Sequence, residues 1–96
     1  MAQQIIVYTE HLKNRLLLRN IDEGLPKEIF EHSRERYIDN ESGYAIATMQ
    51  VELHGRTREV MVAYAEEGDL VKLLTVHPLK DGQKEGRVQA GRWRKI

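Results

Sequence analysis

The spacing of apolar residues along the chain predicts two helices between a first strand and a run of later strands. The β-branched stretch QIIVY at residues 4–8 predicts the first strand. Apolar residues then recur three and four positions apart, which predicts a helix from Glu10 to about Asn20. A second helix is expected to begin at Pro26, which suits a first helical turn, and to include Ile29, Phe30, Ser33 and Tyr37.

From Tyr44 onward the period of the pattern becomes two. Residues 45–53 alternate between apolar and polar side chains, and REVMVAYA (58–65) and LVKLLTVH (70–77) predict two further strands. HGRTR between the first two reads as a hairpin connection, and Pro78 ends the last strand because proline cannot donate to a ladder. KDGQKEG (80–86) predicts a mobile loop, and residues 87–96 predict a short final strand or a tail.

These elements follow the order β-α-α-β-β-β in one domain, residues 1–96, in which 79–96 form a basic loop and tail. Two consecutive helices followed by a meander predict an α+β fold, with both N-terminal helices packed on one face of an antiparallel sheet. Gln50, Glu52 and Lys72 lie on the strands and cannot all be buried, so we expect the opposite face to be partly exposed.

Composition describes a folded chain, with 41% hydrophobic and 31% charged residues. No apolar run has the length needed to cross a membrane, and the first ten residues are too polar for a secretory signal. The absence of cysteine excludes disulfides and thiolate chemistry. We therefore expect a cytoplasmic protein of a bacterium or phage that has no membrane partner.

The net charge is zero but unevenly distributed. Residues 80–96 contain six basic and two acidic residues, a local charge of +4, which leaves −4 on residues 1–79. Such a segment is a candidate contact for phosphates or for an acidic partner, although charged termini are also often merely solvated.

The sequence contains no P-loop, GxGxxG, HExxH, EF-hand or nucleophile-elbow motif. Its four histidines lack the spacing of metal ligands. We therefore expect neither a metal nor a cofactor, and any catalysis has to use side chains alone.

Candidate catalytic side chains begin on the first predicted helix. His11, Arg15 and Arg19 are four residues apart and form one line, with leucines on both sides of it. A solvated stripe normally lies opposite the leucines, so we expect this row to face a groove shared with the sheet. An imidazole can transfer protons near neutral pH, and guanidiniums bind phosphate oxygens.

His77, at the end of the last clear strand, is the fourth candidate catalytic residue. Each candidate has a structural alternative. His11 can bond a backbone carbonyl near the helix start, and His77 can simply close its strand. The two arginines can form ion pairs with nearby acids, namely Glu10, Asp22 or Glu23.

Candidate RNA-binding residues lie mostly near the C-terminus. Trp93 stands between Arg92 and Arg94, where it can stack on a base while its neighbours bind phosphates. It can equally be a core residue that anchors the tail. Tyr44 and Tyr64 offer phenols on the sheet, although tyrosines in strands more often pack. The candidate RNA-binding set is Tyr44, Lys80, Arg92, Trp93 and Arg94.

Several short motifs, spread over residues 4–78, resemble those of small, mostly uncharacterised bacterial domains related to BrnT-type and RelE-type toxins. They are an H-x3-R-x3-R-x-I helix (11–21), a second helix after a proline, a V-x-Y strand end (62–64) and T-V-H-P (75–78). The resemblance implies a RelE-like, microbial RNase-like fold. It also implies metal-independent RNA cleavage through the ribose 2′-hydroxyl.

The positions that match this family are His11, Arg15, Arg19 and His77, and the resemblance implies an RNA substrate and a cognate antitoxin protein as partners. The chain departs from typical RelE-type toxins in its zero net charge and in lacking a complete catalytic set in the last strands. A non-catalytic module that binds RNA or protein, and a structural subunit whose arginines form internal ion pairs, are therefore alternative hypotheses. The sequence leaves the oligomeric state open.

Overall fold

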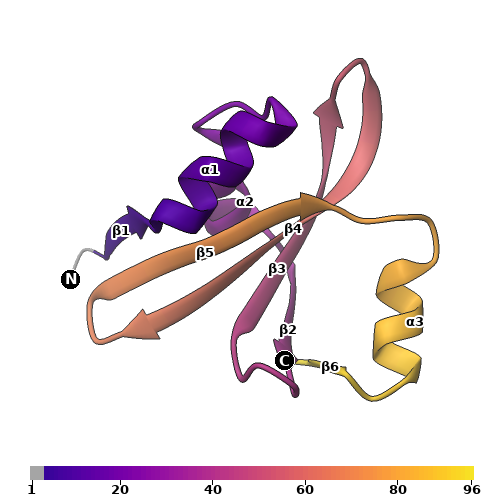
Figure 1. Cartoon of the computed structure of the whole chain (residues 1–96). Coiled ribbons are helices and arrows are strands. Elements are labelled where there is room, and N and C mark those ends of the chain that lie inside the picture. The colour runs from indigo at the N-terminus through magenta and orange to yellow at the C-terminus, as the bar shows by residue number, and fades with distance from the viewer. Residues whose placement is uncertain (1–3) are drawn as a thin grey trace.

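The computed structural model describes residues 4–96, which form three helices and one six-stranded sheet (Figure 1). The strands are β1 (Ile5–Tyr8), β2 (Glu35–Asp39), β3 (Ala45–Leu53), β4 (Arg56–Glu67), β5 (Leu70–Pro78) and β6 (Trp93–Lys95). The helices are α1 (Glu10–Arg19), α2 (Leu25–His32) and α3 (Gln83–Gln89). The expected α+β class is confirmed.

The strands are ordered β1-β5-β4-β3-β2-β6 across the sheet. All neighbours are antiparallel except β1 and β5, which are parallel, so the expectation of an antiparallel sheet is wrong at this edge. The expectation that all helices are N-terminal is also wrong, because α3 follows β5. The observed order to residue 78 is β-α-α-β-β-β-β, one strand more than predicted.

The extra strand arises because the second helix is shorter than its apolar spacing predicts. It ends at His32, and Ser33 is extended at φ −63° and ψ 137°. Residues 35–39, including Tyr37, then form β2. Arg36 stabilises this change of direction, because its guanidinium donates to the carbonyl oxygens of Phe30 and Ser33 at the end of α2. These carbonyls lack partners within the helix.

The segment predicted as a mobile loop is helical over Gln83–Gln89. Gly82 allows the turn into this helix at φ 78°, and the backbone N–H of Lys80 donates to Oε1 of Gln83 at 2.9 Å. No residue of α3 is buried. The helix therefore depends on side-chain contacts with the rest of the molecule, and the short strand β6 follows it.

Both faces of the sheet carry an apolar cluster. The first cluster joins α1 and α2 to one face and includes Leu12, Leu16, Ile29, Phe30, Val60, Val62, Tyr64, Val71, Leu73 and Val76. The second lies on the opposite face and consists of Tyr37, Ile46, Met61, Ala63, Leu79 and Trp93. Neither face is simply exposed, because α1 and α2 cover one and the C-terminal segment covers part of the other.

A bulge in β5 decides which face its last residues occupy. Leu73 pairs with Tyr64 and Thr75 pairs with Ala63, which leaves Leu74 as an extra residue. Residues that pair directly share a face. His77 pairs with Met61 and so lies on the face of the second cluster. Strict alternation from Leu73 would have placed it on the first.

The second half of β5 is a free sheet edge. β1 pairs only with Leu70–Leu73 of β5. Beyond this point the Oγ1 of Thr9 donates to the carbonyl oxygen of Leu74 at 3.0 Å, and α1 packs along β5. Figure 1 shows β5 (orange) passing between α1 (indigo) and α3 (yellow). The end of β5 therefore lies between the two helices.

Candidate functional site

The candidate site is the end of β5 at His77, together with the arginines of α1 and α3 whose positive charges act on it. The imidazole is half-buried on β5, opposite Met61. Burial lowers its pKa below the ordinary value of 6.5, and the positive charges of Arg19, Arg87 and Arg15 lower it further. These guanidiniums belong to α1 and α3, so both helices contribute positive charge that acts on this imidazole. Both effects favour the neutral form of the imidazole.

Arg15 and Arg19 form no ion pair with any carboxylate of residues 4–96. Of the acids expected as partners, Glu10 lies 3.6 Å from Nζ of Lys13, and Asp22 accepts from the backbone N–H of Gly24 at 3.0 Å. Both arginines are half-buried rather than fully solvated. Their charge is therefore available to an anion.

Arg19 also has a donor that finds no acceptor in the described part of the chain. Its Nε is buried and forms no hydrogen bond there. A buried donor left unpaired costs about 1–3 kcal/mol.

His11, the fourth member of the predicted catalytic set, lies at the solvent-exposed end of the row. Its contact is with Arg15, whose Nε donates to Nε2 of His11 at 3.4 Å. This interaction joins the imidazole to the arginines.

Arg87 belongs to the site but was not among the residues predicted from the sequence. Its guanidinium lies 5.2 Å from the centroid of the Trp93 ring, a cation–π contact. The helix α3, to which Arg87 belongs, could not be predicted from the sequence, because the glycines at 82 and 86 interrupt the helical pattern. The remaining signal is the three-residue spacing of Lys84 and Arg87, which places both on one helix face.

Lys84 attaches α3 to the sheet. Its Nζ lies 2.8 Å from Oε2 of Glu35 on β2 and 2.9 Å from Oε2 of Glu59 on β4. Burial acts to lower the pKa of Lys84, but the hydrogen bonds to both carboxylates outweigh it and raise that pKa above its ordinary value. α3 buries no residue. Its attachment to the rest of the molecule therefore depends on the ion pairs of Lys84 with Glu35 and Glu59 and on the Arg87–Trp93 contact.

Trp93 is 1% exposed and lies in the second apolar cluster. Its ring stands 5.6 Å from that of Tyr37, and Arg87 covers it. A base cannot stack on the indole in this arrangement. The placement corresponds to the structural alternative, in which Trp93 anchors the C-terminal segment, and it gives the ring a further part as a support for Arg87.

The remaining predicted RNA-binding residues do not gather around Trp93. Arg92 is bound to acids, with Nε 3.4 Å from Oδ1 of the buried Asp39 and 3.5 Å from Oε2 of Glu41. Arg94 is exposed on the edge strand β6, and Tyr44 is 46% exposed next to β3. Lys80 lies elsewhere, three residues after His77. The predicted set is therefore divided, and Lys80 alone is close in sequence to the candidate site.

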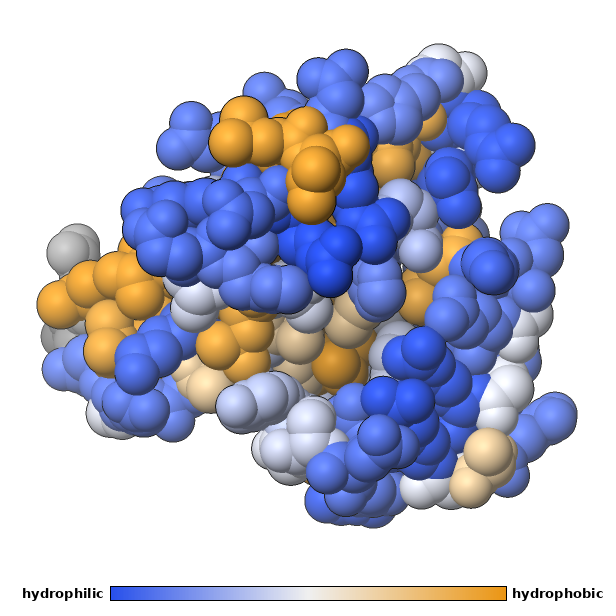
Figure 2. Space-filling model, viewed as in Figure 1, coloured by the Kyte–Doolittle hydropathy of each residue, from blue (hydrophilic) through white to orange (hydrophobic). Residues whose placement is uncertain are grey.

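Hydrophilic and apolar residues are unevenly distributed over the molecular surface. In Figure 2 hydrophilic surface (blue) covers much of α1 and α3 on either side of β5, while apolar patches lie over β1 and on the crest of α1. The exposed apolar residues of these elements are Ile5, Val7, Leu17 and Leu18. The leucines at 17 and 18 are 82% and 77% exposed, so the apolar residues of α1 do not all face the core.

Residues 4–96 contain no group of three or more His, Asp or Glu side chains that could hold a metal ion. None of the helices in this range is long and apolar enough to cross a membrane. Comparison of the chain with protein-family models, with curated proteins and with solved structures found no match. The case for function therefore depends on the geometry around His77.

Proposed function

We propose that this protein acts on RNA as a metal-independent endoribonuclease of the RelE type, with its active site at His77. The observations that carry the proposal are the half-buried His77 at the end of β5, where burial and the positive charges of Arg19, Arg87 and Arg15 lower its pKa, and the absence of any carboxylate of residues 4–96 paired to the two α1 arginines. A neutral imidazole with a lowered pKa accepts a proton at pH 7, and unpaired guanidiniums bind phosphate.

The chemistry follows from these two properties. His77 accepts the proton of a ribose 2′-hydroxyl, and the 2′-oxygen attacks the adjacent phosphorus. The bond from phosphorus to the 5′-oxygen then breaks, leaving a 2′,3′-cyclic phosphate and a 5′-hydroxyl that takes its proton from water. The arginines stabilise the additional negative charge on the phosphorane. No metal or cofactor enters this balance.

Cleavage of a defined single-stranded RNA in EDTA tests the proposal. We expect the wild-type protein to produce cyclic-phosphate ends, His77→Ala to lose this activity, and His11→Ala to retain more of it. Arg15→Ala should cleave poorly and melt within a few degrees of wild type. RNA that remains equally intact with wild type and with His77→Ala would contradict catalysis.

A second candidate function is RNA binding without cleavage. It is favoured by the position of His11, which is exposed and accepts from Arg15, so the site has no second imidazole that is ready to protonate a leaving oxygen. Filter binding at several salt concentrations separates the two functions. Binding with a steep salt dependence and no cleavage would select the second.

A further inference from the structure

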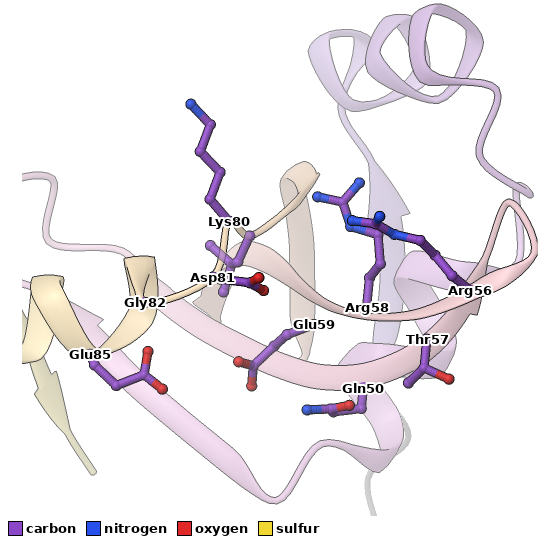
Figure 3. A pocket seen from close by; sticks show the side chains of 10 residues that line it. Gln50, Arg56, Thr57, Arg58, Glu59, Lys80, Asp81, Gly82 and Glu85 are labelled. Atoms are coloured by element: carbon purple, nitrogen blue, oxygen red, sulfur yellow. The ribbon is translucent and has the colours of Figure 1, made fainter.

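A polar hollow of about 250 Å³ lies where the chain leaves β5, directly after the proposed active site (Figure 3). Its lining includes Leu79 and Lys80, which follow His77 by two and three residues. The backbone N–H of Leu79 donates to the carbonyl oxygen of Glu59 at 2.8 Å and so holds this segment against β4. The hollow therefore begins two residues after His77, on a segment that this hydrogen bond fixes against β4.

Three cations line the hollow without a carboxylate partner. They are Arg56 and Arg58 on β4 and Lys80 after β5, and among residues 4–96 none of them forms an ion pair. Figure 3 shows their side chains extending toward the same side of β4. Like charges held on one side without an acid between them favour a bound anion.

The acids that line the same hollow are disposed differently. Glu59 is one residue from Arg58 and so lies on the opposite face of β4, where it is bound by Lys84 at 2.9 Å. In Figure 3 the carboxylate of Glu85 also lies on that opposite side, and Asp81 lies between the two groups. The charges are thus separated, with the cations nearer the side of α1.

The cations continue toward Arg19. Nε2 of His54, in the β3–β4 turn, lies within hydrogen-bond distance (3.1 Å) of the carbonyl oxygen of Arg19. This contact joins the end of α1 to the hairpin whose next strand carries Arg56 and Arg58. The C-terminal end of α1 therefore lies beside the turn that leads into Arg56.

We propose that Arg56, Arg58 and Lys80 form a subsite for an RNA backbone phosphate, next along the strand from the phosphate bound by the α1 arginines at the free edge of β5. This inference rests on the proposed RNA function and specifies its substrate as a single strand several nucleotides long, not a mononucleotide or dinucleotide. The phosphate binds on the arginine side of β4, which is opposite to the face of His77, so the RNA strand has to pass around the free edge of β5 between the two.

The test compares a fluorescent single-stranded hexaribonucleotide with a dinucleoside monophosphate, in EDTA and at several salt concentrations. We expect the double variant Arg56→Ala/Arg58→Ala to bind the hexamer about tenfold more weakly, with a salt slope reduced by ~0.7 for each phosphate that the variant no longer neutralises. Its affinity for the dinucleotide should not change. Asp81→Asn should bind the hexamer more tightly, a change of opposite sign.

Lys27→Ala, which removes one positive charge on α2 away from the hollow, is the matched control and should bind like wild type. Lys80→Ala serves as a second variant should the double variant fail to fold, and it should weaken hexamer binding alone. Unchanged hexamer binding in the folded variants would overturn the subsite while wild-type binding still supported the RNA function. Failure of the wild-type protein to bind either RNA would overturn both.

Discussion

The guanidinium of Arg87 lies 5.2 Å above the ring of Trp93, and this contact connects the C-terminal core to the candidate site. The indole is almost completely buried, so it provides a fixed platform. Arg87 in turn contributes positive charge beside His77 and helps to lower its pKa. A tryptophan expected to stack on a base thus acts on the site through an arginine.

Removal of Arg87 should change the titration of His77 before any RNA is added. In Arg87→Ala the pKa of His77 is expected to rise toward 6.5, because one of the positive charges that disfavour the imidazolium is gone. Titration of the imidazole C–H signals by NMR measures this directly. Lys27→Ala is the control, and an identical His77 titration in both variants would contradict the placement of Arg87.

His77 should also make stability depend on pH. Its pKa is lower in the folded state than in the unfolded chain, where it is near 6.5, so the unfolded state binds the proton first as pH falls. The free energy of unfolding should therefore decrease as pH falls through 6.5 toward the folded pKa. Urea unfolding of wild type and His77→Gln at pH 7.5 and 5.0 tests this: the variant should lose less stability, and equal losses would refute it.

Replacement of Lys84 should release α3. Lys84→Gln leaves Glu35 and Glu59 without their cation, and we expect a loss of about 1–2 kcal/mol, between the values for exposed and buried ion pairs. The pKa of His77 should rise as well, because Arg87 moves with α3. Thermal melting and the same NMR titration provide the two measurements.

The control for Lys84 is Lys72→Gln, whose pair with Glu67 is 3.5 Å long and exposed. This variant should lose less than ~0.5 kcal/mol and leave His77 unchanged. Equal destabilisation by the two substitutions would contradict the prediction that the ion pairs of Lys84 attach α3 to the sheet.

Trp93 should behave as a core residue that supports the site. Trp93→Ala is expected to cost about 3–5 kcal/mol of stability, as other large-to-small core changes do. Trp93→Phe retains an aromatic ring beneath Arg87, so it should fold and keep most of its RNA affinity. A Trp93→Phe protein that is as stable as wild type but no longer binds RNA would instead indicate a direct contact with a base.

The sequence by itself determined those helices and strands that depend on neighbouring residues in the chain. The two-residue period from Tyr44 to Pro78 predicted three long strands, because one side of each strand must be apolar to be buried. The first helix was also predicted within about one residue, since Thr9 caps it and Asn20 ends it in the left-handed conformation. The α+β class followed from this order of elements.

Tertiary structure decided the rest. Ser33 and Tyr37 continue a helical spacing in sequence, but Arg36 caps the end of α2 and pairing with β3 makes residues 35–39 a strand. The glycine-rich α3 gains its stability from Lys84 and two carboxylates that are 49 and 25 residues distant in the chain. Local propensity cannot report such partners.

The candidate site shows the same division. The candidate catalytic residues His11, Arg15, Arg19 and His77 could be named from the sequence. Their residue types and spacing are enough to suggest proton transfer and phosphate binding. The assembly of the site was not visible, because the bulge at Leu74 rotates His77 to the second face and α3 brings Arg87 beside it. Both depend on strand register and on ion pairs distant in sequence, which only the folded chain establishes.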